Sequence, residues 1–157
     1  AAFQPVIANV KNPVMTHHYM NDALILAKHF NKRECVKKYP GLFFKPGYPL
    51  KYFIYNLLEM MFPQFTGMYT VHGPAPYLKS TFEEVWSVEG EVLSLASNNK
   101  FRCNTDINQY LFREWQKLSG NVYPKNVHSY LGYYEIDNTN DSLCKAIRKQ
   151  NKKIVCT

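Results

Sequence analysis

Apolar side chains recur at intervals of three and four residues in several segments of the chain, the spacing of helices that bury one face. The first such segment covers residues 17–30. A second, more uniformly apolar segment covers residues 50–61 and ends before Pro63. Between them, the basic residues 31–39 favour a short helix before a turn at residues 40–41. This part of the chain is therefore predicted to be mainly helical.

Two later helices are predicted from polar residues that precede an apolar stripe. Residues 80–83 (Ser-Thr-Phe-Glu) have the spacing of a capping box, in which a hydroxyl and a carboxylate satisfy free backbone N–H groups. The stripe that follows comprises Phe82, Val85, Trp86, Val92 and Leu93. The next helix is expected to start at Thr105 or Asp106. Its stripe comprises Ile107, Tyr110, Leu111, Trp115 and Leu118. Because Trp86 and Trp115 lie on these stripes, we expect both to pack in the core.

Runs of β-favouring residues predict three short strands, at residues 66–71, 130–136 and 153–157. A short basic helix at residues 142–149 is expected between the last two strands. A chain of 157 residues, 46% of them hydrophobic, is long enough for one domain with its own core. We therefore expect an α/β fold class, namely a helix-rich fragment with a few short strands, in a single domain over residues 1–157. Because strand-like runs stand at both ends, each end is expected to be a cut.

The excess of basic over acidic residues indicates an anionic partner. Nineteen Lys and Arg residues against 12 Asp and Glu residues give a formal net charge of +7. Nucleotide, nucleic acid, anionic lipid and acidic polysaccharide all fit this charge. The four cysteines form no Cys-x-x-Cys pair and follow no signal-like start, so we expect reduced cytosolic thiols. No apolar run reaches the roughly 20 residues of a membrane-spanning helix.

Cationic side chains stand directly before the two predicted helix starts, an arrangement that suits phosphate binding. Lys79 precedes one start and Arg102 the other, and helix N-termini attract anions through their free N–H groups. His72, in a loop with Gly and Pro, can accept a hydroxyl proton or, when protonated, neutralise phosphate charge. Asp106 and Asn108 can hydrogen-bond to substrate, although Asp106 is equally suited to be a simple helix cap. Solvated surface cations and a structural loop histidine are the ordinary alternatives.

The chain resembles the Stealth family of sugar-phosphate transferases, and most of all bacterial capsular polysaccharide phosphotransferases, in four segments: KSTFEEVW, KFR, TDINQYLFREWQKLSG and CKAIRKQNKKIVCT. Four conserved regions define that family. Residues from about 1 to 65 look like the end of the second region with a helical linker, about 66–122 like the third, and about 141–157 like the start of the fourth. The resemblance implies the C-terminal part of a larger nucleotide-sugar transferase domain.

The resemblance also implies a reaction and its residues. By matching motif, His72 and Arg102 correspond to catalytic residues, and Asp106 and Asn108 to polar positions that open the next helix. Lys79 is our further candidate for phosphate binding. In such enzymes a sugar 1-phosphate, typically N-acetylglucosamine 1-phosphate from UDP-N-acetylglucosamine, passes to a hydroxyl of another sugar and UMP leaves.

Partners and location follow from the same resemblance. The implied partners are a nucleotide-sugar donor and an oligosaccharide or polysaccharide acceptor, and not nucleic acid. The implied location is the cytoplasm, with peripheral association at the inner face of the membrane. No metal ligands are expected within the chain, since Mg²⁺ or Mn²⁺ would be held mainly by upstream parts of the parent enzyme.

The chain departs from the family pattern in three places. It lacks the Asp-rich motif of the first region and the Asn-Asp-Asp motif of the second, for which Asn21 and Asp22 are not a substitute. The loop after His72 reads Gly-Pro-Ala-Pro, where relatives place a larger residue next to the histidine. The Asn-Asp pair that would follow Thr157 is missing. We therefore expect the chain to be inactive by itself.

Two other function classes fit the sequence. A nucleotide-sugar glycosyltransferase would use the same donor but release UDP. A non-catalytic basic module would bind polysaccharide or nucleic acid through its many Lys, Arg, Tyr and Phe residues.

Overall fold

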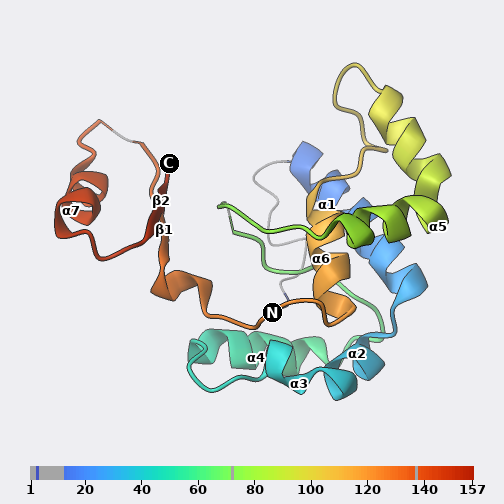
Figure 1. Cartoon of the computed structure of the whole chain (residues 1–157), viewed down its shortest axis with the longest axis horizontal. Coiled ribbons are helices and arrows are strands. Elements are labelled where there is room, and N and C mark those ends of the chain that lie inside the picture. Colours follow the sequence, from blue (N-terminus) through green and yellow to red (C-terminus); the bar gives the residue numbers. More distant parts are fainter. Residues whose placement is uncertain (1–2, 4–12, 72, 137) are drawn as a thin grey trace. The chain divides into compact units, whose positions relative to one another are not determined.

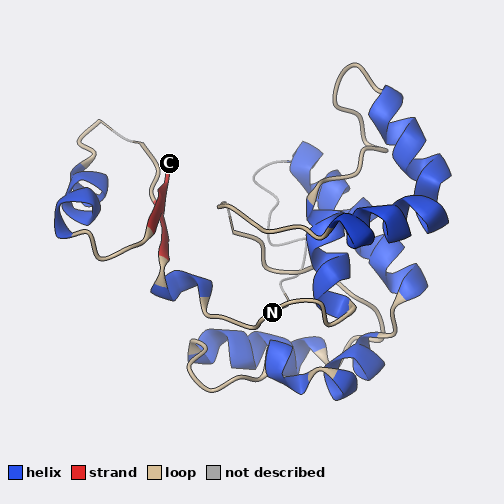
Figure 2. Ribbon diagram, in the orientation of Figure 1, coloured by secondary structure: helices blue, strands red, loops and turns tan. Residues whose placement is uncertain are grey.

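The computed structural model describes residues 3, 13–71, 73–136 and 138–157. The chain divides into two compact units, one within residues 1–69 and 76–124 and the other within residues 70–75 and 125–157. The larger unit is helical, and the smaller one contains the strands of the fold (Figure 2). Among the described residues the strands form one two-stranded sheet, so the chain has the helix-rich, mixed α/β character that its sequence predicts.

Six helices build the described part of the larger unit (Figure 1). They are α1 (Pro13–His29), α2 (Lys32–Lys38), α3 (Pro40–Phe43), α4 (Leu50–Glu59), α5 (Lys79–Asn98) and α6 (Tyr110–Leu118). The predicted helices at residues 17–30, 31–39 and 50–61 are confirmed. The expected turn at residues 40–41 is instead the start of α3, because Pro40 occupies the first helical position, where its missing N–H costs nothing.

Helix α6 is the centre of the larger unit and packs against both α1 and α5. Leu111, Trp115 and Leu118 are almost completely buried in the core cluster. The Trp115 ring meets the edge of Phe30 at a centroid distance of 4.8 Å and stacks obliquely on His29 at 4.9 Å. These contacts confirm the predicted burial of Trp115 and fix the end of α1 against α6.

The predicted burial of Trp86 is wrong, because this side chain is 43% exposed. The buried line along α5 runs through Thr81, Val85, Glu89 and Leu93, so Trp86 lies beside it. At Glu89 the backbone leaves the helical region (φ −127°, ψ 26°) and α5 is kinked. The buried line includes the polar residues Thr81 and Glu89, so the apolar residues alone do not mark the face of α5 that meets the core.

Two predicted features of the larger unit are also wrong. Residues 66–71 do not form a strand; in the described chain their β contact is an isolated antiparallel bridge from Met68 to Phe3, and Gly67 beside it has a φ of 141°, outside the range of regular strands. The capping box does not form either, since α5 begins at Lys79, preceded by Leu78 with no side-chain cap. Glu83 instead forms an ion pair with Lys79 at 3.3 Å.

The smaller unit contains a strand, a helix and a second strand parallel to the first. They are β1 (Leu131–Tyr133), α7 (Asp141–Lys149) and β2 (Ile154–Cys156), preceded by the 3₁₀ helix η2 (Val127–Ser129). Leu131 pairs with Ile154 and Tyr133 with Cys156. Parallel strands need a crossover connection, and α7 supplies it. The sequence prediction of strand, basic helix and strand is confirmed, with shorter strands than expected.

Candidate functional site

The loop between α5 and α6, residues 99–109, is folded around the carboxylate of Asp106. This carboxylate accepts hydrogen bonds from the backbone N–H of Cys103 at 2.9 Å and from the Asn99 amide at 2.6 Å, and the Cys103 thiol lies 3.2 Å away. The backbone N–H of Cys103, followed by the Asn99 and Cys103 side chains, lowers the pKa of Asp106 below its usual value. Asp106 is therefore an ionised group that holds the loop in one conformation.

Helix α6 does not begin at Asp106, as the sequence suggested, but four residues later at Tyr110. The N-cap residue, Gln109, makes no side-chain cap bond, but the side-chain oxygen of Asn108 accepts from the backbone N–H of Tyr110 at 3.2 Å. Asn108 is 9% exposed. Because this start is buried and already holds a capping oxygen, the structure does not show the free anion-binding N-terminus that we predicted at Asp106.

Helix α1 holds the same loop from the other side. The Asn21 amide donates to the backbone oxygens of Asn104 at 2.8 Å and Asp106 at 2.9 Å. The next residue, Asp22, accepts a hydrogen bond from the backbone N–H of Asn108 at 3.1 Å. No role was predicted for Asn21 and Asp22. They are adjacent polar residues between apolar ones, and no local pattern indicates which loop they contact.

Asp22 and His18 lie one turn apart on α1 and are both buried, with exposed fractions of 4% and 5%. Burial raises the pKa of Asp22 well above its ordinary value, and the negative charge of Glu114 adds to this rise, while the Asn108 N–H opposes it. One Asp22 oxygen and the Nε2 atom of His18 have no hydrogen-bond partner among the described residues. Burial thus favours the uncharged form of the Asp22 carboxyl group.

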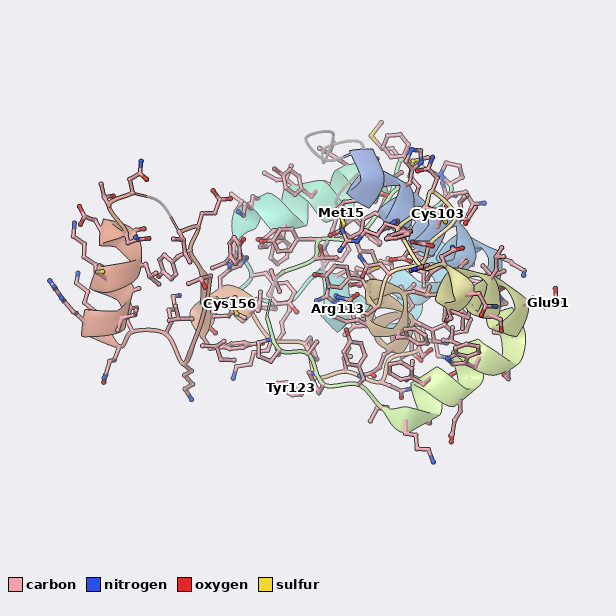
Figure 3. All side chains as sticks on the ribbon, turned by 90° about the horizontal axis from the view of Figure 1, so that it is seen from above. Met15, Glu91, Cys103, Arg113, Tyr123 and Cys156 are labelled. Carbon is pink, nitrogen blue, oxygen red and sulfur yellow. The ribbon has the colours of Figure 1, made fainter. Side chains whose placement is uncertain are left out.

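Charged side chains continue along the buried face of α6. The Arg113 guanidinium lies over the Tyr110 ring at 4.3 Å and donates to Glu114 at 3.1 Å. The Lys117 ammonium donates to both Glu114 oxygens at 2.9 and 2.8 Å. Arg113 appears in the interior of the helical unit in Figure 3. All these partners belong to α6, and ion pairs of this kind satisfy charges that would otherwise be costly to bury.

Arg102 and Lys100 are both exposed cations of this loop, and Arg102 is the one that contacts α1. Its guanidinium approaches the sulfur of Met15 in the first turns of α1 at 3.7 Å, and Met15 and Cys103 are labelled at this junction in Figure 3. The loop backbone on either side of Arg102 is fixed by Asp106, whereas the guanidinium itself faces solvent. Arg102 can therefore present its planar donor fork to an anion from a rigid support.

Lys79 is not brought to Arg102. The start of α1 meets Arg102, whereas the end of α1 meets Glu89 in the middle of α5, through Lys28 and His29. Lys79 lies another ten residues before Glu89, at the far end of α5 (Figure 1). Its side chain is 90% exposed and paired with Glu83. The two cations that precede the predicted helix starts thus do not form one phosphate site in this structure.

His72 lies outside the described residues. The segment that follows it is held from α6, because Gln116 accepts a hydrogen bond from the Leu78 N–H at 2.9 Å and donates to the Pro76 oxygen at 3.5 Å. The same amide donates to the Asn121 oxygen at 3.2 Å. Gln116 therefore fixes the backbone between the His72 loop and α5, a role that no local sequence pattern signals.

No group of three or more His, Cys, Asp or Glu side chains in the described ranges is arranged to hold a metal ion. The cysteines at positions 35, 103, 144 and 156 are free thiols. Of the helices that the structure describes, none combines the length and apolar character that spanning a membrane requires.

The chain is similar over most of its length to bacterial proteins named as polysaccharide phosphotransferases. The capsular polysaccharide phosphotransferase WcwK of Streptococcus pneumoniae is 30% identical over 154 residues, which cover 98% of the chain and 45% of that relative. The receptor polysaccharide phosphotransferase WefC of Streptococcus gordonii is 34% identical over 140 residues, with 89% and 41% covered. The exopolysaccharide phosphotransferase cps2G of Lactiplantibacillus plantarum is 26% identical over 129 residues, with 77% and 37% covered.

The chain thus spans less than half the length of these three relatives. No family model and no solved structure matches it.

Proposed function

From this similarity to polysaccharide phosphotransferases, we propose that the chain is the C-terminal part of a bacterial enzyme that transfers a sugar phosphate during synthesis of a capsular or other extracellular polysaccharide. The observation that carries the proposal is the similarity itself, because it extends over 77–98% of the chain in relatives from three bacterial species that are all named as phosphotransferases. The proposed membership of the Stealth family rests on the motifs quoted above.

The proposed donor is UDP-N-acetylglucosamine, and the acceptor is a sugar hydroxyl of the growing polysaccharide. The acceptor oxygen forms a bond to the phosphorus that carries the sugar, and the bond from that phosphorus to the bridging oxygen of the leaving UMP breaks. The acceptor proton passes to a base, for which His72 is our candidate. The product is a phosphodiester.

Arg102 is proposed to neutralise the transferred phosphate. Phosphoryl transfer depends mainly on alignment and on compensation of negative charge, and a guanidinium on a rigid loop supplies the second. The hydrogen bonds of Asp106 and Asn108 within the protein support a positioning role for both: they hold the loop from which Arg102 projects. Lys79, at the opposite end of α5, would bind a different part of donor or acceptor.

Mg²⁺ or Mn²⁺ is proposed to accompany the donor, held mainly by parts of the enzyme beyond this chain. A divalent cation would compensate pyrophosphate charge. We also propose a cytoplasmic enzyme that works at the inner face of the membrane.

The testing experiment is phosphorus NMR of the full-length protein with UDP-N-acetylglucosamine, Mg²⁺ and a capsule-like oligosaccharide. We expect UMP together with a new phosphodiester resonance. UDP without that resonance would overturn the proposal and indicate a glycosyltransferase. An unchanged donor with retained polysaccharide binding would instead indicate a non-catalytic basic module.

A further inference from the structure

Helix α4 is oriented with its polar residues inward and its apolar residues outward. Its buried residues are Tyr52, Asn56 and Glu59, and two of these three are polar. The opposite side carries large apolar residues that are 47–78% exposed: Leu50, Ile54, Tyr55, Leu57, Leu58 and, just beyond the helix, Met61 and Phe62. Helices of soluble domains normally have the reverse arrangement. We call these seven residues the outer face of α4.

The inward polar residues are held by specific bonds, so the orientation of α4 is fixed. The Asn56 side chain accepts from the Phe3 N–H at 2.8 Å and donates to the Phe43 oxygen at 2.7 Å. The Glu59 carboxylate accepts from the Thr66 N–H at 3.0 Å and from the Thr66 hydroxyl at 2.7 Å. A rotation of α4 that buried the outer face would leave these polar groups without partners.

A buried lysine reinforces the same orientation. Lys32 is only 1% exposed. Its ammonium group donates to the backbone oxygens of Glu59 at 2.6 Å and Gln64 at 2.7 Å. It lies 3.5 Å from the Glu59 carboxylate. Breaking a buried pair of this kind is strongly destabilising. The outer face of α4 is therefore a stable feature of the helical unit.

The outer face has the spacing of a surface that packs against protein. Leu50, Ile54, Leu57, Leu58 and Met61 follow one another at intervals of four, three, one and three residues, which forms a continuous stripe along the helix. Contiguous exposed apolar patches mark interaction surfaces. Helices that lie on membranes carry several cations along their polar side, whereas α4 has one, Lys51, and its polar side is buried in the unit. The stripe therefore fits an apolar protein surface better than lipid.

We infer that the outer face of α4 is covered, within the same polypeptide, by the part of the enzyme that corresponds to the rest of its relatives' length. This inference rests on the proposed function, which makes the chain the C-terminal part of a longer enzyme. More than half of each relative lies outside its match to the chain, and a corresponding part of the proposed enzyme would be large enough to cover this face. Its expected chemistry is apolar, complementary to leucine, isoleucine and methionine side chains. The outer face is then an internal interface that joins the two halves of the enzyme.

The test compares thiol labelling of two variants, each in the 157-residue chain and in the full-length protein. Leu57→Cys reports the outer face, and Leu24→Cys on α1 is its matched control, because Leu57 and Leu24 are both 67% exposed. Maleimide labelling is followed by peptide mass spectrometry, which separates the introduced thiol from the natural cysteines. In the 157-residue chain we expect similar rates. In the full-length protein we expect the labelling rate of Leu57→Cys to fall about ten-fold or more, which corresponds to a cost of ~1.4 kcal/mol for exposing the thiol. The labelling rate of Leu24→Cys should not change.

Three results would overturn the inference. Equal labelling of Leu57→Cys in both proteins would show that the face stays exposed. Protection that requires phosphatidylglycerol vesicles would assign the face to a membrane, and protection that rises with protein concentration would assign it to a second copy of the protein. The labelling measurement does not depend on sugar-phosphate transfer. Protection of Leu57→Cys without UMP production would therefore contradict the proposed reaction but still support the interface.

Discussion

Asp22 of α1 accepts a hydrogen bond from the backbone N–H of Asn108, 86 positions later in the chain, at 3.1 Å. Together with the Asn21 amide, it connects α1 to the loop that carries Arg102. The carboxyl group is buried, and its second oxygen has no partner in the described part of the chain. Asp22 therefore fixes the loop at a cost in stability that depends on pH.

The first prediction concerns Asp22→Asn. The asparagine keeps an oxygen for the Asn108 N–H but cannot ionise. The pKa of Asp22 is raised above 3.8 in the folded state, so the folded wild type binds this proton more tightly than the unfolded chain does. The wild type therefore loses stability as pH rises from about 3.8 to the folded-state pKa. The variant should be more stable at neutral pH, because burial opposes the charge of Asp22 and the asparagine carries none. Urea unfolding at a series of pH values measures this.

At pH values below 3.8 the difference between Asp22→Asn and wild type should disappear, since Asp22 is then protonated in both states. A difference that stayed constant across the pH range would contradict the prediction.

The second prediction concerns Arg102→Ala in the full-length enzyme. Loss of the guanidinium should lower kcat/KM by about 100-fold, equivalent to ~2.7 kcal/mol, because one charge-assisted contact to the transferred phosphate is lost. Arg33→Ala is the matched control, since Arg33 is also exposed but lies on α2. UMP release measures both. If the two variants lost activity equally, diffuse basic binding would explain the data better than a defined phosphate contact.

The third prediction concerns the kink of α5. The buried Glu89 carboxylate accepts from the Lys28 ammonium at 2.5 Å and lies 2.5 Å from His29 Nε2. Although burial raises the pKa of Glu89, these two partners lower it below its ordinary value of 4.5. Glu89→Gln should therefore destabilise the protein at neutral pH by about 1–3 kcal/mol. The wild type should lose this contribution as pH falls through the folded-state pKa.

Glu91→Gln is the control for Glu89, because Glu91 stands on the exposed side of α5, where Figure 3 labels it. Its effect on thermal unfolding should be close to zero. A loss at Glu91 as large as that at Glu89 would show that general charge, and not the contact with Lys28 and His29, is responsible.

The fourth prediction compares the two tryptophans. Trp115, 3% exposed, packs against Phe30 and His29, so Trp115→Ala should cost about 3–5 kcal/mol, as for other large core truncations. Trp86 is 43% exposed, so Trp86→Ala should lower the free energy of unfolding by less than about 1 kcal/mol. Chemical denaturation of both variants measures the difference. Equal losses would contradict the orientation of α5.

The sequence predicted the elements whose structure is decided locally. Helix α1 has a regular apolar spacing, and in the smaller unit the order of strand, basic helix and strand is plain from residues 130–157. The predictions were wrong where contacts between residues distant in the sequence determine the local structure. Trp86 lies beside the buried line of α5, and the position on that line next to the kink, Glu89, is held by Lys28 and His29, 61 and 60 positions earlier.

The candidate site shows the same limit. Arg102 was proposed from sequence as a cation before a helix start, but α6 begins eight residues after it, at Tyr110, and Arg102 lies exposed on the preceding loop. Asp106 was predicted to open α6, but its carboxylate accepts hydrogen bonds from the preceding residues Cys103 and Asn99. The N–H of Tyr110, the first residue of α6, instead donates to the Asn108 side chain. The roles of Asn21, Asp22 and Gln116 depend on folding partners that a local pattern does not reveal.

The hydrogen bonds of Gln116 have a further consequence for α5. The local sequence at residues 80–83 favours a helix start at Ser80, yet the observed helix includes Lys79 and begins after Leu78, whose N–H is bound by the Gln116 side chain. The chain thus encodes two competing start points for the same helix. The residue that precedes the observed start is held by a side chain of α6, 38 positions after Leu78, so the observed start is supported by a contact between two helices that are distant in the sequence.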